Sequence, residues 1–289
     1  MEYSLSNAHI SIKINSLGAE LCSLVAHQTE YLWQADPLYW KRHSPVLFPI
    51  VGNVYQNEYR IDGKTYHLSQ HGFVRDREFE LVEQSEDTIR FRLKSDEESL
   101  QKYPFAFELE IGYQLIGNKV KVLWTVKNTG NDSMPFQIGA HPAFYYPDFQ
   151  AEDEVKGFFG FDTQELSYIL IKNGGADTAH HYQLTTKEAL PLTNSLFAED
   201  ALIVENGQVH SVCLMDKEKR PWLTVHFDAP VVGLWSPPQK NAPFVCIEPW
   251  YGRCDESGYK GEFADKEWMQ KLAAGEQFHA SYIIEIANR

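Results

Sequence analysis

The sequence predicts an all-β protein built as one large antiparallel β domain, and three observations favour this class. Short runs of alternating apolar and polar residues recur along most of the chain. Turn residues such as Asp62-Gly63 and Gly117-Asn118 separate these runs and suit tight hairpins. No stretch has the length of a helix that could cover a parallel sheet. We therefore expect antiparallel strands and only a few short helices.

The first half of the chain has the clearest strand patterns. Residues 1–35 alternate in short strand-like runs, and residues 59–68 predict a hairpin. Two prolines surround a short apolar run within residues 39–54, which suits a sheet edge or an irregular approach to a cleft. Residues 105–130 predict two long strands that are joined at Gly117-Asn118.

The second half is less regular. Polar loops fill residues 148–186, and short strands are expected between residues 201 and 227. A short helix is expected near Lys266 to Ala274, ended by Gly275 and followed by a final strand. Because no linker, biased segment or fixed-period repeat divides the chain, we expect residues 1–289 to form a single domain.

Composition excludes several classes of function. The net charge of −14 argues against nucleic-acid binding, which needs a basic face. No apolar run reaches membrane-spanning length, and the first residues lack a basic segment followed by a hydrophobic one. The four cysteines form no CxxC pair, which favours reduced thiols. We expect a cytoplasmic protein, monomer or homodimer, without nucleic-acid or membrane partners.

One histidine stands where a strand is expected to stop. In the stretch MPFQIGAHPAFYYP (134–147), apolar residues lead to His141, and Pro142 follows. Proline has no N–H to donate, so the strand should end or bulge there and could direct His141 into a cleft. The aromatic residues Phe144, Tyr145 and Tyr146 have flat faces suited to stacking on a sugar ring. The alternative is a core histidine at a strand end.

A carboxylate occupies a similar place downstream. In FVCIEPWYG (244–252), Glu248 closes a buried-looking run and meets Pro249. A carboxylate that ends one strand and a histidine that ends another form a plausible acid–base pair. Trp235, Trp250 and Tyr251 near Glu248 could stack on a sugar, although at least one of the three should pack in the core instead.

The stretch QHGFVRD (70–76) gathers polar residues that could bind hydroxyls or an anion. His71 and Arg75 are donors, while Asp76 could equally pair with Arg75 in a solvated loop. Arg42 has the same ambiguity. The histidines at 43, 67 and 71 match no metal-ligand spacing, and no nucleophile elbow, phosphate loop or dinucleotide fingerprint is present. We expect neither metal nor cofactor.

Three of these stretches, HGFVRDREF, IGAHPAF and CIEPWYG, in that order resemble the aldose 1-epimerase (galactose mutarotase) superfamily, in particular its LacX-like branch. The resemblance covers essentially the whole chain. It implies a galactose mutarotase-like supersandwich, a large antiparallel β-sandwich, and a cofactor-independent isomerase that interconverts the α and β anomers of a free hexose. The histidine that matches His141 would act as general acid at the ring oxygen. The glutamate that matches Glu248 would act as general base at the anomeric hydroxyl.

The resemblance also implies residues that bind the substrate. His71, Arg42 and Asp200 match the family's sugar-binding histidine, arginine and aspartate, although the residues around Arg42 depart from the galactose-specific pattern. Trp235 is expected to add an aromatic face. Arg75 in HGFVR is instead similar to the hexose-6-phosphate epimerase branch, so the partner is a sugar or a sugar phosphate.

Two alternatives to a hexose epimerase remain open. One is a hexose-6-phosphate 1-epimerase, and the other is a non-catalytic carbohydrate-binding or sensing protein that keeps the cleft. A lyase or hydrolase is disfavoured because no second carboxylate suits glycoside cleavage. The charge state of the pair is also open, since mutual attraction would favour the charged forms of His141 and Glu248 and burial would favour the neutral ones.

Overall fold

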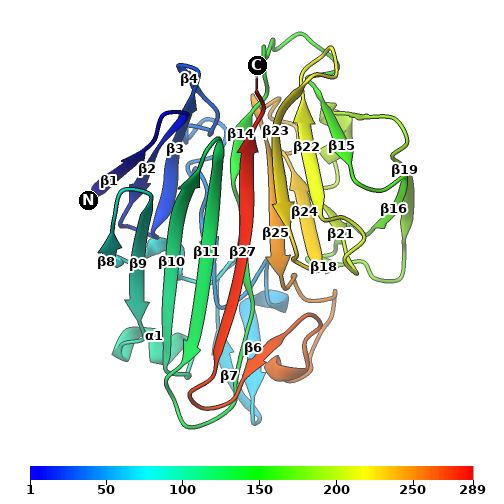
Figure 1. Cartoon of the computed structure of the whole chain (residues 1–289). Coiled ribbons are helices and arrows are strands. Elements are labelled where there is room, and N and C mark those ends of the chain that lie inside the picture. The colour runs from blue at the N-terminus through cyan, green and yellow to red at the C-terminus, as the bar shows by residue number, and fades with distance from the viewer. Residues whose placement is uncertain (289) are drawn as a thin grey trace.

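The largest part of the structure is a nine-stranded antiparallel sheet. A computed structural model describes residues 1–288 of the chain, and Figure 1 shows the long central strands of this sheet side by side. In spatial order its strands are β20 (Leu190–Pro191), β15 (Phe158–Phe161), β22 (Ser211–Met215), β23 (Pro221–Phe227), β27 (Gln277–Ile286), β11 (Lys119–Asn128), β10 (Phe107–Ile116), β9 (Thr88–Lys94) and β8 (Glu80–Gln84).

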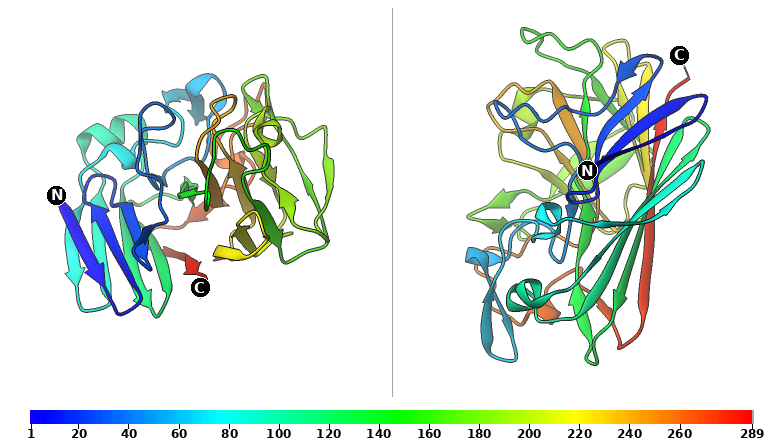
Figure 2. Two further views of the ribbon diagram at one scale, coloured as in Figure 1. Left: turned by 90° about the horizontal axis from the view of Figure 1, so that it is seen from above. Right: turned by 90° about the vertical axis from the view of Figure 1, so that its left-hand side faces the viewer.

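A second sheet has six strands and a long central member. Its order is β21 (Leu202–Val204), β24 (Val231–Trp235), β25 (Phe244–Tyr251), β13 (Ile138–Ala140) and β5 (Val46–Leu47), and β14 (Ala143–Tyr145) also pairs with β25. The side view in Figure 2 places the long strands of the nine-stranded sheet along one side of the molecule. β5 has only two residues and lies at the edge of this sheet, next to two prolines. The sequence predicted a sheet edge here, because proline cannot donate a backbone hydrogen bond.

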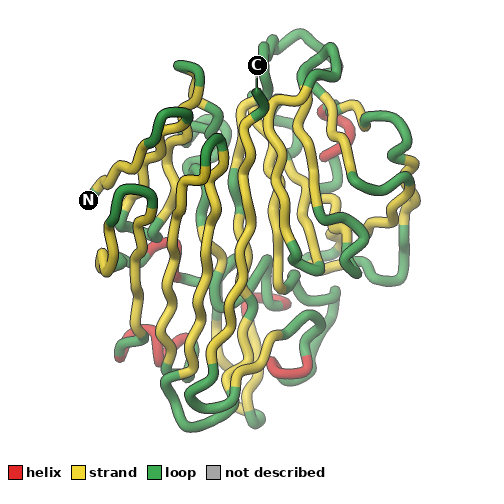
Figure 3. The backbone as a smooth tube through the Cα atoms, viewed as in Figure 1, coloured by secondary structure: helices red, strands yellow, loops and turns green. Residues whose placement is uncertain are grey.

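Smaller elements complete the molecule. A four-stranded sheet contains β1 (Glu2–Ser6), β2 (Ile10–Asn15), β3 (Glu20–Ala26) and β4 (Thr29–Glu30). Four two-stranded pairs are β6 (Glu58–Ile61) with β7 (Lys64–His67), β12 (Met134–Phe136) with β26 (Gln270–Leu272), β16 (Glu165–Tyr168) with β19 (Tyr182–Thr185), and β17 (Ile171–Lys172) with β18 (Gly175–Ala176). Within residues 1–288, helix is confined to α1 (Glu97–Lys102) and four 3₁₀ turns, η1 (Tyr55–Asn57), η2 (Val74–Asp76), η3 (Asn194–Phe197) and η4 (Phe263–Asp265). Figure 3 shows the helical segments in red.

The alternating pattern of the long strands builds the core. On β11 the side chains of Val120, Val122, Trp124 and Val126 are at most 1% exposed, and the residues between them face outward. Each fully buried aliphatic side chain contributes about 1.5–3 kcal/mol of apolar burial. One continuous cluster joins this face to side chains of the other two large sheets, including Ile12 and Ile247. The predicted all-β antiparallel fold is confirmed.

The local predictions were right for hairpins and wrong for the helix. The turns at Asp62-Gly63 and Gly117-Asn118 join β6 to β7 and β10 to β11 as expected. The expected helix near Lys266 to Ala274 is absent, because Trp268 has φ of 59° and the chain then forms β26 against β12. The sequence reading also missed α1, which Asp96 and Ser99 cap reciprocally.

No helix among residues 1–288 combines the length and apolar character needed to cross a membrane. All four cysteines are free, and of these Cys246 and Cys254 are buried. Cytoplasmic location and oligomeric state stay predictions.

Two glycines make room for one indole ring, the side chain of Trp250. Trp250 on β25 lies between Gly139 on β13 and Gly233 on β24. A Cβ atom at Gly139 would come within 2.6 Å of Trp250 Cδ1, and one at Gly233 within 2.4 Å of Trp250 Cη2. Only glycine therefore lets the ring lie flat on the sheet, where Nε1 donates to the Ala140 carbonyl at 3.2 Å.

We expect Gly233→Ala to lower the free energy of unfolding by roughly 1–3 kcal/mol, because the added methyl group overpacks against the Trp250 ring. Thermal or urea unfolding measures this change. Gly112→Ala on β10 is the matched control, since its nearest contact would be an ordinary 3.4 Å. Equal stability of the two variants would contradict the packing argument.

Candidate active site

The site is formed by a gap in the ladder between β25 and its neighbours. β14 pairs with β25 as far as Ala143 opposite Cys246, and β13 resumes the pairing at Gly139 opposite Trp250. His141-Pro142 lies in this gap, opposite the segment 247–249. The expected strand end before His141 is confirmed.

Glu248 does not end its strand, and that expectation was wrong. β25 continues through Pro249 to Tyr251, because on its other side Gly233 of β24 lies opposite Glu248 and Val232 lies opposite Pro249. Pro249 falls in the segment that faces the gap, where pairing with β13 and β14 is interrupted. Its missing N–H is thus tolerated inside a strand.

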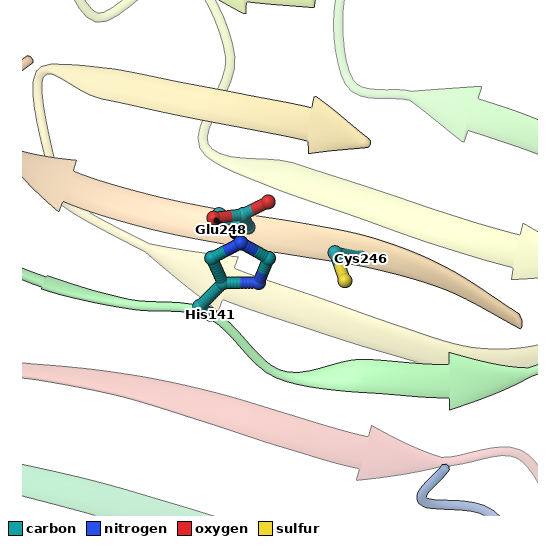
Figure 4. Close-up of side chains that lie close together, drawn as sticks. All are labelled: His141, Cys246 and Glu248. Carbon is teal, nitrogen blue, oxygen red and sulfur yellow. Dashed lines mark ion pairs between the residues drawn. The ribbon is translucent and has the colours of Figure 1, made fainter. Parts of the chain in front are cut away.

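His141 and Glu248 face each other across this gap. His141 Nε2 lies 3.3 Å from Glu248 Oε2, and the two residues are 7% and 1% exposed. Figure 4 shows the imidazole with one nitrogen directed at the carboxylate and Cys246 to one side. Neither Glu248 Oε2 nor His141 Nδ1 has a hydrogen-bond partner outside its own residue in the described chain. Both atoms are available to a ligand.

Burial decides the charge state that the sequence left open. It lowers the pKa of His141 to about 3, and the positive charge of Arg75 adds to this effect. Burial also raises the pKa of Glu248 well above its usual value, helped by the nearby charge of Asp200. Both shifts favour neutral groups.

His71 is oriented as a hydrogen-bond donor to the cavity. The backbone N–H of Gly52 donates to His71 Nδ1 at 3.0 Å, so the neutral ring carries its proton on Nε2. Burial is the main cause that lowers the pKa of His71, and the nearby His141 adds to this effect. The lowered pKa keeps the His71 ring neutral. Gly72 allows this loop to approach the chain closely, because a Cβ there would meet the Phe48 carbonyl at 2.1 Å.

A cavity of about 330 Å³ brings most of the expected residues together. Six of the seven sequence-predicted site residues line it, namely His71, Arg75, His141, Asp200, Trp235 and Glu248. The seventh, Arg42, is not part of the lining; its guanidinium is held by the two Asp76 carboxylate oxygens at 2.9 and 3.1 Å. The acid–base pair, a histidine donor, an acidic acceptor and an aromatic face thus share one cavity.

Arg75 keeps part of its hydrogen-bonding capacity free. Its Nη2 donates to the Gln70 carbonyl at 2.7 Å, while its buried Nε has no hydrogen-bond partner in the part of the chain described and lies 3.9 Å from Asp76. Burial and the neighbouring Arg42 lower the pKa of Arg75 to about 10, so it stays charged at neutral pH.

Asp200 also lines the cavity. It adopts φ of 74° after η3 and accepts the N–H of Ala201 at 2.8 Å. Much of the residue is exposed, but its carboxyl faces the cavity, and desolvation there raises its pKa. The Ala201 N–H and the Trp235 side chain both donate to this carboxyl group. A carboxylate has further lone pairs that can accept a hydroxyl group.

The aromatic residues divide between cavity and core. Trp235 and Trp250 line the cavity, whereas Tyr251 packs against Phe278 in the core, as was expected for at least one of the three. The stacking role suggested for Phe144, Tyr145 and Tyr146 was wrong. These side chains lie away from the cavity because β14 pairs with β25 beyond the gap and turns them into the core and toward another surface hollow.

Several lining residues escaped the sequence analysis. They are Trp40, Gly52, Gln70, Ile171, Ala201, Ile203, Pro238 and Cys254. Trp40, two residues before Arg42, and Gln70, beside His71, adjoin residues that were singled out. The others come from strands and loops whose apolar residues look like any core position.

His141, Cys246 and Glu248 form a potential metal site, which differs from the histidine set considered from sequence. One ligand atom from each lies within 4.8 Å of the others. Imidazole, thiolate and carboxylate are ligands that zinc accepts. Ligation would need the buried Cys246 thiol to ionise, yet burial raises its pKa well above the ordinary value. The expectation of no metal stays a prediction.

The fold and site define a large antiparallel β-sandwich with a buried histidine–carboxylate pair in a polar, aromatic-lined cavity. The family described as aldose 1-epimerase matches residues 1–285. The chain therefore belongs to the aldose 1-epimerase family.

Individual relatives match the chain over its whole length. Protein LacX of Lactococcus lactis subsp. lactis is 33% identical, with 100% of both chains covered. The structure of a galactose mutarotase related enzyme from Lactobacillus acidophilus superposes with a TM-score of 0.94 at 35% identity, covering 100% of this chain and 98% of that one. A galactose mutarotase-like protein from Lactobacillus casei gives 0.90 at 30% identity, covering 99% and 100%.

Glu248→Gln should stabilise the fold at alkaline pH. The pKa of the Glu248 carboxyl group is higher in the folded chain than in the unfolded chain. When the pH rises above the pKa of the unfolded chain, only the unfolded chain ionises, so the free energy of unfolding falls. We expect the melting temperature to rise by at least about 2 °C at pH 8, the shift that roughly 1 kcal/mol produces. The difference should shrink toward pH 5.

Glu188→Gln, at an exposed position, is the control and should leave the melting temperature unchanged at both pH values. A difference for Glu248→Gln that stayed constant from pH 5 to pH 8 would contradict the raised carboxyl pKa.

Proposed function

We propose that this protein is an aldose 1-epimerase that interconverts the α and β anomers of a free hexose without a cofactor. The observation that carries the proposal is the 3.3 Å contact between His141 and Glu248 in the lining of a cavity of about 330 Å³. In a hemiacetal the ring oxygen and the anomeric hydroxyl are bonded to the same carbon. Two proton-transfer groups must therefore lie next to each other to reach both oxygens.

Ring opening needs one proton to leave and one to arrive. Glu248 as carboxylate takes the proton of the anomeric hydroxyl, and His141 as imidazolium gives one to the ring oxygen. The bond between the anomeric carbon and the ring oxygen breaks, and the anomeric carbon becomes a carbonyl. Rotation about the neighbouring C–C bond and reversal of the transfers close the ring on the other face. Each positioned group contributes about 10² to 10⁴ in rate.

The electrostatics of the site support this cycle. Ring opening converts an imidazolium and a carboxylate into a neutral imidazole and a neutral carboxyl group. The pKa shifts of both residues favour these neutral forms, because the pair is buried. Burial thus stabilises the state in which the sugar is open, and the total number of protons on the pair stays one throughout.

The other cavity residues would hold the sugar. His71 presents an N–H, Asp200 presents an acceptor oxygen and Trp235 presents an aromatic face. A neutral hexose can use all three kinds of contact through its hydroxyl groups and its C–H face.

We expect Glu248→Gln to lower the turnover number at least about 100-fold while the affinity for the sugar stays within a few-fold, since glutamine keeps the shape and removes the base. His141→Asn should act likewise on the acid side. NMR exchange between anomers measures turnover, and calorimetry measures binding.

Glu188→Gln and His67→Asn, at exposed positions, are the matched controls and should keep turnover. Loss of binding with normal turnover would make Glu248 a sugar clamp. If the protein bound sugars but no aldose exchanged faster than in buffer, it would be a carbohydrate-binding or sensing protein instead.

A sugar phosphate is the second candidate substrate. The unpartnered Nε of Arg75, close to Arg42, favours it because a guanidinium group can bind phosphate with two parallel hydrogen bonds. The carboxylate of Asp76 weighs against it, since it already pairs with Arg42 and lies near Arg75.

With a neutral hexose as substrate, Arg75→Ala should change kcat/KM for a hexose and for its 6-phosphate by similar factors. Parallel anomer-exchange assays on the two substrates test this. A loss of more than about tenfold confined to the 6-phosphate would assign Arg75 to phosphate binding. Arg60→Ala, on the β6–β7 hairpin outside the cavity lining, is the control.

A further inference from the structure

Trp40 covers one face of His141. The two rings are stacked with centroids 4.7 Å apart and planes inclined by 27°. Trp235 and His71 contact the same imidazole through perpendicular arrangements at 5.3 and 5.4 Å. Glu248 lies at the Nε2 edge of the imidazole and does not cover its faces. Without Trp40, the ring face on which the indole stacks would be open to the cavity.

The loop that carries Trp40 is held at several points. Trp33 Nε1 donates to the Trp40 carbonyl at 2.8 Å, and Lys240 Nζ donates to the Tyr39 and Leu38 carbonyls at 2.9 and 3.3 Å. After Trp40, Glu20 Oε1 accepts the N–H groups of His43 and Ser44 at 2.8 and 2.9 Å.

Aromatic packing holds the ring itself. Trp40 contacts Trp235 edge-on at 5.7 Å and stacks on Phe244 at 6.0 Å. A ring fixed in this way can in turn fix the ring against which it lies. His141 needs such support, because its Nδ1 has no hydrogen-bond partner outside its own residue in the described chain.

We propose that Trp40 is a positioning residue that orients the His141 imidazole toward Glu248 and keeps water from the pair. The kinetic part of this inference rests on the proposed function, whereas the structural part does not.

Two effects of the indole act on the protonation of His141 in opposite directions. Its π face attracts an imidazolium. By excluding water it also contributes to the desolvation that lowers the pKa of His141. Desolvation is the largest cause of that shift, so removal of the indole should raise the pKa.

A substitution at Trp40 leaves the other groups that act on His141 chemically unchanged. Glu248 and Cys246 face it from β25, His71 from the loop after β7, Arg75 from η2, and Arg42 from the loop that follows Trp40. A change in titration can therefore be assigned to the indole.

The experiment is an NMR titration of the histidine ring signals in Trp40→Ala, Trp40→Leu and Trp40→Phe, with His141→Asn used to assign the signal. We expect the His141 pKa to move toward the ordinary value of about 6.5 in Trp40→Ala. Trp40→Phe should stay close to wild type. In Trp40→Leu the His141 pKa should lie between these two values. This variant replaces Trp40→Ala in the test if the alanine variant does not fold.

Leu38→Ala is the matched control, since this side chain belongs to the same loop and is 70% exposed. It should leave the titration unchanged. Wild-type titration of His141 in all three Trp40 variants, or an equal shift in Leu38→Ala, would overturn the proposal.

Kinetics separate this inference from the proposed function. We expect Trp40→Ala to lower kcat for anomer exchange at least about tenfold with KM within a few-fold, and Trp40→Phe to restore most of the rate. A lowered affinity with unchanged kcat would instead make Trp40 only a sugar-binding surface and contradict the positioning role. If no variant and no wild-type protein exchanged anomers, the proposed function would fail, while the titration would still decide the role of Trp40.

Discussion

The site depends on an interruption in the pairing of β25. Between Cys246 and Trp250 this strand lacks partners on one side, and His141-Pro142 fills the space that a regular ladder would occupy. Prolines on both sides of the gap cannot donate the N–H bonds that would close it. The other edge of β25 stays paired with β24, so the carboxylate of Glu248 has a rigid support. A local defect in an otherwise continuous sheet thus sets the 3.3 Å contact between the two side chains.

The same contact links stability to chemistry. Two ionisable groups are held in a buried environment that favours their neutral forms, and this arrangement opposes folding whenever the unfolded chain would ionise. An ordinary core would replace such a pair by apolar residues. Retaining it makes sense if proton transfer between the two groups and a substrate is what the site does. The aromatic residues around His141 maintain this environment, and the glycines beside Trp250 let the aromatic layer lie close to the sheet.

Sequence patterns predicted the class of fold and most of the site for physical reasons. Alternation on strands such as β11 and the glycine turns reflects local rules, so the strands and hairpins were found. Proline after a buried run indicated His141 and Glu248. The expected helix near Lys266 failed because β26 forms through pairing with the distant β12, which no local pattern reveals. Trp40 was missed for a related reason, since its role comes from a loop that crosses over His141 only in the folded chain. Arg42 was found but lies outside the cavity lining, because Asp76 binds it.

A crystal structure of the protein with a bound hexose tests the central claim most directly. The account predicts that the sugar lies in the cavity with its ring oxygen within about 2.6–3.2 Å of His141 Nε2 and its anomeric hydroxyl at a similar distance from the Glu248 carboxylate. A sugar bound with its anomeric carbon turned toward the solvent, and with neither oxygen in reach of the pair, would contradict it.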